Sequence, residues 1–155
     1  TRLARLASGE ADITLLAAAG LARLGETGVG TALDEEDWLP APAQGAIGIE
    51  CRADDARVRG LLAPIDHAPS RAEVMAERTL LAALGGTCHS PIAVLTRWDD
   101  GLLIMRAALF SGDGIDRIEA SGRFAAGDLA GPAGLARELL TLAPPAIAAL
   151  FEGGA

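Results

Sequence analysis

The clearest hydrophobic pattern lies after residue 54, where apolar residues recur every three or four positions in two successive segments. This spacing predicts two amphipathic helices. The repeating residues are Val58, Leu61 and Leu62 in the first segment and Val74, Leu81 and Leu84 in the second. We expect Pro64 to end the first helix. A capping box of Ser70 and Glu73 predicts the start of the second helix, and Gly85-Gly86 predict its end.

Three apolar runs of strand length follow, at 92–98, 102–110 and 115–123. Asp100-Gly101 and residues 112–114 lie where hairpin turns belong. A last helix is predicted to begin near Pro132, a favoured residue of the first turn, and Pro144-Pro145 interrupts it. Its apolar stripe comprises Leu135, Leu139, Leu142, Ile147, Leu150 and Phe151. Residues 54–155 therefore predict an α+β domain, a three-stranded antiparallel sheet with helices packed on one face.

The first part of the chain has a different pattern. Residues 1–25 predict a helix, a strand and a second short helix, and the strand is the apolar run 13–19, of the kind that is covered on both faces. Gly20 is expected to end this strand. Residues 26–43 are rich in glycine, acidic residues and proline, which predicts a connector between structural units. Residues 44–52 predict a further strand.

Composition excludes several classes of function. Half of the residues are hydrophobic and 22% are charged, which is typical of a folded globular chain. The net charge of −8 argues against a general nucleic-acid surface, and no apolar run has the length of a membrane span, so we expect neither partner. All 13 basic residues are arginine, which excludes lysine chemistry from this segment. We expect the acidic run 34–37 to be a solvated face.

Cys88 lies in the loop between the best predicted helix and the best predicted strand. The residues alone leave three interpretations: a structural thiol, a redox-sensing thiol, or the attachment point of a covalent group. Adjacent residues rarely direct their side chains at each other, so a Cys88–His89 hydrolase pair is poorly supported. His67 and His89 have no ligand-spaced partners, so no metal site is predicted. Cys51 is interpreted as a small buried core residue, and the two cysteines form no disulfide framework, which favours a cytoplasmic location.

Arg23 would follow the C-terminal end of the predicted strand 13–19, where α/β folds usually keep their ligand sites. The alternative is a solvated arginine on a short helix. These observations leave the function of the chain open.

Three ordered motifs, at residues 1–3 with 15–25, at 44–52 and at 85–92, resemble the porphobilinogen deaminase (hydroxymethylbilane synthase) family. The resemblance covers the whole chain but only about the C-terminal half of the family's sequence. It implies that residues 1–40 end a periplasmic-binding-protein-like α/β domain 2. Residues 41–53 would be the crossover strand that returns to domain 1, and residues 54–155 the cofactor-bearing α+β domain 3.

The resemblance also implies roles for individual residues. Cys88 would carry a dipyrromethane cofactor through a thioether. Arg2 and Arg23 would pair with the acetate and propionate groups of the cofactor and the growing chain, and the backbone at Gly20 would approach the pyrroles. Gln44 and Gly45 would bind substrate beside the cleft. Ala43 departs from the family, which commonly has glycine before the glutamine.

The family's enzymes are transferases of tetrapyrrole (haem) biosynthesis that join four porphobilinogen units with loss of ammonia. The implied partners are porphobilinogen, the growing polypyrrole and the N-terminal half of the same protein. The family's catalytic acid lies upstream of Thr1, so we expect no catalytic residue in this segment, and we expect the isolated piece to be inactive. The alternative is a non-catalytic α+β binding module whose Cys88 is structural or redox-sensing.

Overall fold

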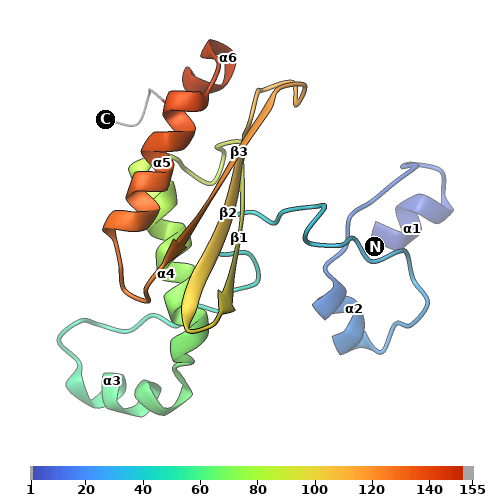
Figure 1. Ribbon diagram of the computed structural model, residues 1–155. Coiled ribbons are helices and arrows are strands. Elements are labelled where there is room, and N and C mark those ends of the chain that lie inside the picture. Colours follow the sequence, from blue (N-terminus) through green and yellow to red (C-terminus); the bar gives the residue numbers. More distant parts are fainter. Residues whose placement is uncertain (1, 152–155) are drawn as a thin grey trace. The chain divides into compact units, whose positions relative to one another are not determined.

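The computed structural model describes residues 2–151 (Figure 1). The chain forms two compact units, which divide between Asp34 and Glu35, and each is described by itself. Among the described residues, no helix is both long and apolar enough to cross a membrane.

The first unit contains two short helices, α1 (Arg2–Ala7) and α2 (Ala18–Leu24). The prediction of a buried strand at 13–19 is wrong. Residues 13–17 are not part of any sheet, and Ile13 and Leu15 are 83% and 58% exposed. A strand needs a neighbour to satisfy its backbone groups, and the described part of this unit offers none.

Gly20 consequently lies inside α2 and does not end a strand. Arg23 occupies the last turn of that helix, so it does not follow a strand end either. A glycine ends α2: Gly25 adopts a left-handed conformation with φ 71°, and its N–H bonds to the carbonyls of Ala22 and Leu21.

The second unit is built on an antiparallel sheet with the order β1-β2-β3. Its strands are β1 (Ile92–Asp99), β2 (Leu102–Phe110) and β3 (Arg117–Phe124), which confirms the predicted meander. Asp100 and Gly101 join β1 to β2 and both have positive φ, 47° and 76°. Two left-handed residues in succession give the tight hairpin whose twist matches the strands.

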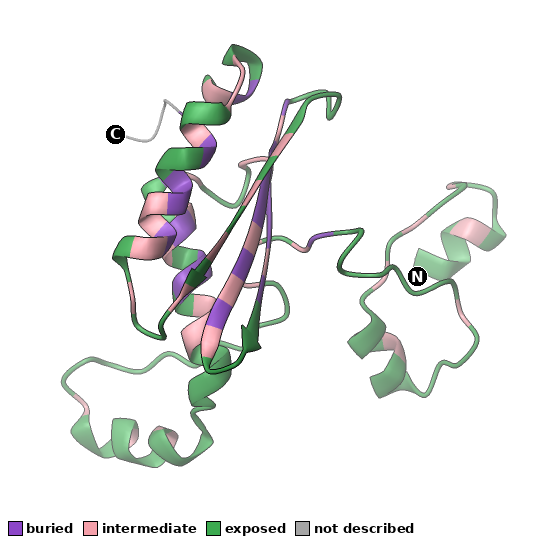
Figure 2. Cartoon of the chain, in the orientation of Figure 1, coloured by how far each residue is buried: buried purple, intermediate pink, exposed green. Residues whose placement is uncertain are grey.

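Two helices, α4 (Ala68–Ala83) and α5 (Ala130–Leu142), cover one face of this sheet. The unit also contains α3 (Ala56–Leu62), η1 (Ala63–Ile65) and α6 (Pro145–Ala148). Figure 2 shows that buried residues gather where α4 and α5 face the strands. The core consists of Ala76, Leu80, Leu84, Ile92, Val94, Leu103, Met105, Ala107, Leu109, Leu135, Ala136, Leu139, Ile147 and Phe151. The α+β prediction is therefore confirmed for this unit.

The predicted helix ends are confirmed only in part. The α-helix α3 stops at Leu62 with Ala63 as its cap, directly before Pro64 as predicted, and the 3₁₀ turn η1 then follows to Ile65. The capping box is wrong: α4 begins at Ala68, and His67 is its cap, with Nδ1 accepting the Ser70 N–H at 3.4 Å. Pro69 fits the first turn, where a helix needs no N–H donor, so the helix starts before Ser70.

The segment 44–52 is not a strand. It begins with a turn and continues without pairing to any described strand, and Ile47 is 91% exposed. Cys51 is likewise exposed, so its interpretation as a core residue is wrong. As at residues 13–17, the apolar pattern is that of a strand, but the described chain supplies no neighbour for it.

A strap formed by residues 35–43 covers part of the other face of the sheet. Leu39 packs against Ala93 and Ala108, and the Val94 N–H donates to the carbonyl of Pro40 at 2.7 Å. The acidic run 34–37, expected to be only a solvated face, contributes ion pairs here. The carboxylates of Glu35 and Glu36 bind Arg97 and Arg106 at N–O distances of 2.7–3.0 Å; these pairs are Glu35–Arg97, Glu36–Arg97 and Glu36–Arg106.

Candidate functional site

Cys88 lies in the loop that joins α4 to β1. The helix ends at Ala83 with Leu84 as its C-cap, and Gly85 follows with φ 65°. At Gly86 an added Cβ would lie 2.5 Å from Leu81 Cδ1 and 3.3 Å from the Leu81 carbonyl oxygen. The chain therefore passes close to the helix at Gly86, where a larger residue would have to displace the Leu81 side chain.

Residues Thr87 to Ser90 form a turn with Cys88 and His89 at its centre. The Ser90 N–H donates to the Thr87 carbonyl at 3.1 Å, which closes the turn. Two side chains strengthen it: the Thr87 N–H donates to Ser90 Oγ at 2.9 Å, and the His89 N–H donates to Thr87 Oγ1 at 3.2 Å. Cys88 is a free, exposed cysteine, so its thiol is presented to solvent from an ordered turn.

A second turn contains Gln44 and Gly45, which are both exposed. Ala43 precedes them with φ 57°, and Gly45 has φ 77°. Left-handed backbone costs a residue with a Cβ about 1–2 kcal/mol, so the backbone conformation at Ala43 would suit a glycine better than an alanine. Here the Ala43 N–H donates to Glu77 Oε2 at 2.6 Å.

Glu77 was not among the residues predicted to be functional, although its position in the sequence was a signal. It falls on the apolar stripe of Val74, Leu81 and Leu84, and it is only 8% exposed. Burial raises the pKa of this carboxyl above its ordinary value, and the bond from Ala43 opposes part of that rise. A carboxylate kept on the buried side of a helix normally has a specific partner, and Ala43 supplies one.

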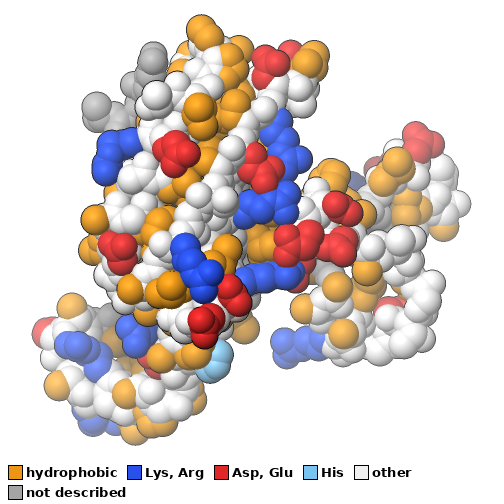
Figure 3. All heavy atoms as spheres, in the orientation of Figure 1, with side chains coloured by type: hydrophobic (Ala, Val, Ile, Leu, Met, Phe, Trp, Pro, Cys, Tyr) orange, Lys and Arg blue, Asp and Glu red, His pale blue; other side chains and the backbone are white. Residues whose placement is uncertain are grey.

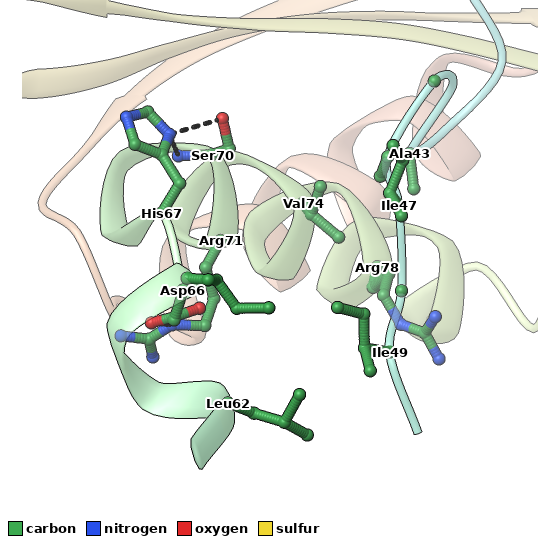
Figure 4. A pocket seen from close by; sticks show the side chains of 14 residues that line it. Ala43, Ile47, Ile49, Leu62, Asp66, His67, Ser70, Arg71, Val74 and Arg78 are labelled. Atoms are coloured by element: carbon green, nitrogen blue, oxygen red, sulfur yellow. Dashed lines mark hydrogen bonds and ion pairs between the residues drawn. The ribbon is translucent and has the colours of Figure 1, made fainter. Parts of the chain in front are cut away.

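Two hollows flank the Gln44 turn. The larger, of about 750 Å³, lies between the segment 46–49 and the helices α3 and α4. Figure 4 shows apolar side chains of Ile47, Ile49, Leu62 and Val74 around it, with Arg78 near one end and the Asp66–Arg71 pair near the other. The smaller hollow, of about 350 Å³, is bordered by Gln44, Glu73, Glu77 and Thr96.

Three residues implied by the resemblance lie in the first unit, and all three are exposed. Arg2 donates from Nη1 to the Leu15 carbonyl at 3.0 Å, so its guanidinium is partly tied to the loop after α1. Gly20 and Arg23 lie on α2. Cys88, Gln44 and Gly45 belong to the second unit. The described residues contain no group of three or more His, Cys, Asp or Glu that could hold a metal ion.

Comparison with known proteins identifies two domains of one family. The family model described as "Porphobilinogen deaminase, dipyromethane cofactor binding domain" matches residues 1–60, and "Porphobilinogen deaminase, C-terminal domain" matches residues 71–140, which include Cys88. A porphobilinogen deaminase of Sphingopyxis alaskensis is 55% identical over 152 residues, which are 97% of this chain and 48% of the relative. One from Xanthomonas oryzae pv. oryzae is 49% identical over 116 residues, 74% of this chain and 38% of the relative. The chain thus spans about half the length of the Sphingopyxis relative.

Proposed function

Because the chain belongs to the porphobilinogen deaminase family, we propose that it is the C-terminal part of a hydroxymethylbilane synthase. This transferase of tetrapyrrole biosynthesis joins four porphobilinogen units head to tail with loss of ammonia. The observation that carries the proposal is the exposed Cys88, centred in an ordered turn within the region that matches the family's C-terminal domain.

Cys88 would hold the dipyrromethane cofactor through a thioether. The exposed thiol on a fixed turn fits such a group, because it is accessible to a large reactant and its direction is defined by the turn. Bound there, the cofactor supplies the pyrrole to which the first substrate unit is added. Tethering this primer makes every coupling the reaction of a held partner, which raises the effective concentration of the growing end.

Arg2 and Arg23 would bind the carboxylates of the pyrroles. Each pyrrole brings two carboxylates, and guanidinium groups bind them in a planar, two-pronged manner. Because the chain carries a net charge of −8, this recognition requires local arginines and cannot come from a basic surface.

Gly20 would allow a close approach of the pyrroles to α2. A Cβ added there would contact only Ala17 Cβ, at 3.9 Å. Packing within the described chain therefore does not require a glycine in this helix, where it costs about 0.5–1 kcal/mol relative to alanine. A ligand that needs the space is a sufficient reason for it.

Gln44 and Gly45 would contact the substrate from the turn between the two hollows. Both are exposed, and the left-handed Ala43 and Gly45 fix the backbone on either side of the Gln44 amide. No catalytic acid is assigned to this segment.

The N-terminal half of the same protein would supply the catalytic acid and the remaining arginines. The exposed apolar runs 13–17 and 46–52 support this, since both have the pattern of strands but pair with no strand of the described chain. In the full enzyme, residues 1–40 would end a periplasmic-binding-protein-like domain 2, residues 41–53 would cross to domain 1, and residues 54–155 would form domain 3. Two free, exposed cysteines support a reducing, cytoplasmic location.

The test is the intact mass of the full-length protein and of two cysteine variants. Wild type and the matched control Cys51→Ala are expected to carry an adduct of dipyrromethane size, and Cys88→Ala is expected to lack it. An adduct that persists in Cys88→Ala would contradict the proposed attachment. An unmodified wild-type mass would favour the non-catalytic module, and rapid oxidation of Cys88 without an adduct would favour a redox-sensing thiol.

A further inference from the structure

The strongest unassigned feature is the contact between a buried carboxylate and a strained turn. Glu77 extends from the buried side of α4, between Ala76 and Leu80 in the core, and its Oε2 accepts the Ala43 N–H at 2.6 Å. A bond from a backbone N–H to a carboxylate is shorter and stronger than one to a neutral acceptor. Glu77 therefore holds a specific backbone atom from inside the domain.

The N–H that Glu77 binds belongs to Ala43, whose backbone conformation would otherwise relax. Ala43 and Gly45 are both left-handed, and the turn between them is closed by bonds from the Gln44 N–H to the Ala41 carbonyl and from the Ala46 N–H to the Ala43 carbonyl. Alanine remains left-handed only where the surroundings over-determine its conformation. Glu77 provides that constraint at the residue immediately before Gln44.

The strap before this turn is already fixed to the sheet. Leu39 is 8% exposed, and the Pro40 carbonyl accepts the Val94 N–H. After the turn the chain is no longer packed on the domain at Ile47, whose side chain is 91% exposed. The Glu77–Ala43 bond is therefore the last fixed point of the strap, and the Gln44 turn belongs to the same unit as Cys88.

We propose that Glu77 is a positioning residue for the polypyrrole: it fixes the Ala43–Gly45 turn, so that Gln44 and Gly45 keep one position relative to the primer on Cys88. This inference rests on the proposed function, which gives Gln44 and Gly45 to the substrate. It adds a residue that touches no reacting atom and acts through the backbone of Ala43.

The test uses the full-length protein with substitutions at both ends of the bond. Glu77→Leu removes the acceptor, and Glu77→Gln keeps an oxygen that accepts the same N–H. Ala43→Val disfavours the left-handed backbone without altering the buried site, whereas Ala43→Gly tolerates it. Glu73→Leu is the matched control, because Glu73 lies one turn earlier on α4 and is only half-buried.

We expect Glu77→Leu and Ala43→Val to raise the KM for porphobilinogen at least fivefold, with kcat and adduct occupancy within twofold of wild type. Glu77→Gln, Ala43→Gly and Glu73→Leu are expected to leave KM within twofold. If the double variant Ala43→Gly/Glu77→Leu restores KM, the effect of Glu77→Leu comes from the position of the turn and not from general destabilisation. An unchanged KM in both Glu77→Leu and Ala43→Val would overturn the proposal, and if Glu77→Leu does not fold, Ala43→Val against Ala43→Gly decides.

Hydrogen exchange of the amides in residues 43–46 gives a readout that does not depend on turnover. Exchange there is expected to be at least tenfold faster in Glu77→Leu than in Glu73→Leu, and equal exchange would refute the constraint. If the wild-type protein carries no adduct, the proposed function fails on its own test, while the exchange rates still decide whether Glu77 fixes the turn.

Discussion

Glu77 shows how one residue sets a pH dependence for the whole domain. Burial is the main cause that raises its pKa above 4.5, the neighbouring Glu73 carboxylate adds to the rise, and the Ala43 N–H opposes it. The folded-state pKa is therefore higher than the unfolded-state pKa. Such a group contributes stability that is fully present below pH 4.5 and is lost as the pH rises through the folded-state pKa.

Glu77→Gln does not titrate, so it removes this dependence. We predict that the free energy of unfolding of Glu77→Gln minus that of wild type increases as the pH rises from 4 to 7. The variant therefore becomes more stable relative to wild type. Urea unfolding at the two pH values measures it. Other carboxyl groups, such as Glu119 with a lowered pKa beside Arg106 and Arg117, titrate in both proteins and cancel. A difference between the two proteins that stays constant with pH would contradict the prediction.

Single residues also show which features can be predicted from the sequence and which cannot. The glycine stops and the exposed loop of Cys88 follow from local chemistry and were predictable. The left-handed Ala43 was not, because its conformation depends on a carboxylate 34 residues away. Ser70 and Glu73 have the spacing of a capping box, but the helix starts before them at Ala68.

At the scale of elements, α5 stabilises the domain mainly by packing against the sheet. Leu139 is fully buried, whereas Leu142, one turn later on the same helix, is 55% exposed. We predict that Leu139→Ala lowers the free energy of unfolding by about 2–5 kcal/mol, since it leaves a cavity. Leu142→Ala is the matched control and is expected to cost about 0.5 kcal/mol. Equal losses in urea unfolding would show that the helix is packed differently.

The strap is held partly by charge. Acidic and arginine side chains alternate over the exposed side of the sheet (Figure 3), in a series that links Glu36, Arg106, Glu119 and Arg117. These groups are partly exposed, so each pair contributes about 0–1 kcal/mol and is screened by salt. The hydrophobic contact of Leu39 supports the same segment without charge.

We predict that Arg97→Gln, which removes the pairs to Glu35 and Glu36, lowers the free energy of unfolding by at most about 1 kcal/mol at low salt. In 1 M NaCl the difference from wild type should fall towards zero, because the Debye length is then about 3 Å. Arg137→Gln on α5 serves as a control for removing an arginine. A loss that is insensitive to salt would indicate that Arg97 acts through packing.

The three strands of the meander were predictable and the two isolated apolar runs were not, for one physical reason. Each strand of the sheet has its neighbour within a hairpin, so local alternation and turn residues suffice to define it. The runs 13–19 and 44–52 carry the same apolar signal, but pairing requires a strand that the described chain does not contain. Local pattern records the tendency to form a strand, and the partner decides whether a strand forms.

At the scale of the whole molecule, these unpaired runs agree with the coverage of the relatives. The chain matches 48% of the length of its Sphingopyxis relative, and it exposes Ile13, Leu15, Ile47 and Ile49. Apolar side chains in extended segments are normally covered by neighbouring strands. The proposed function places those strands, and the catalytic acid, in the N-terminal half.

The purified 155-residue chain is therefore predicted to consume no porphobilinogen above the rate of a protein-free blank. It carries the proposed attachment cysteine and two of the proposed carboxylate-binding arginines, but the proposed function assigns the catalytic acid and the remaining arginines to the N-terminal half. The full-length protein, assayed at the same concentration, is the positive control. Consumption by the 155-residue chain that Cys88→Ala abolishes would place the catalytic acid within this segment and would contradict the prediction.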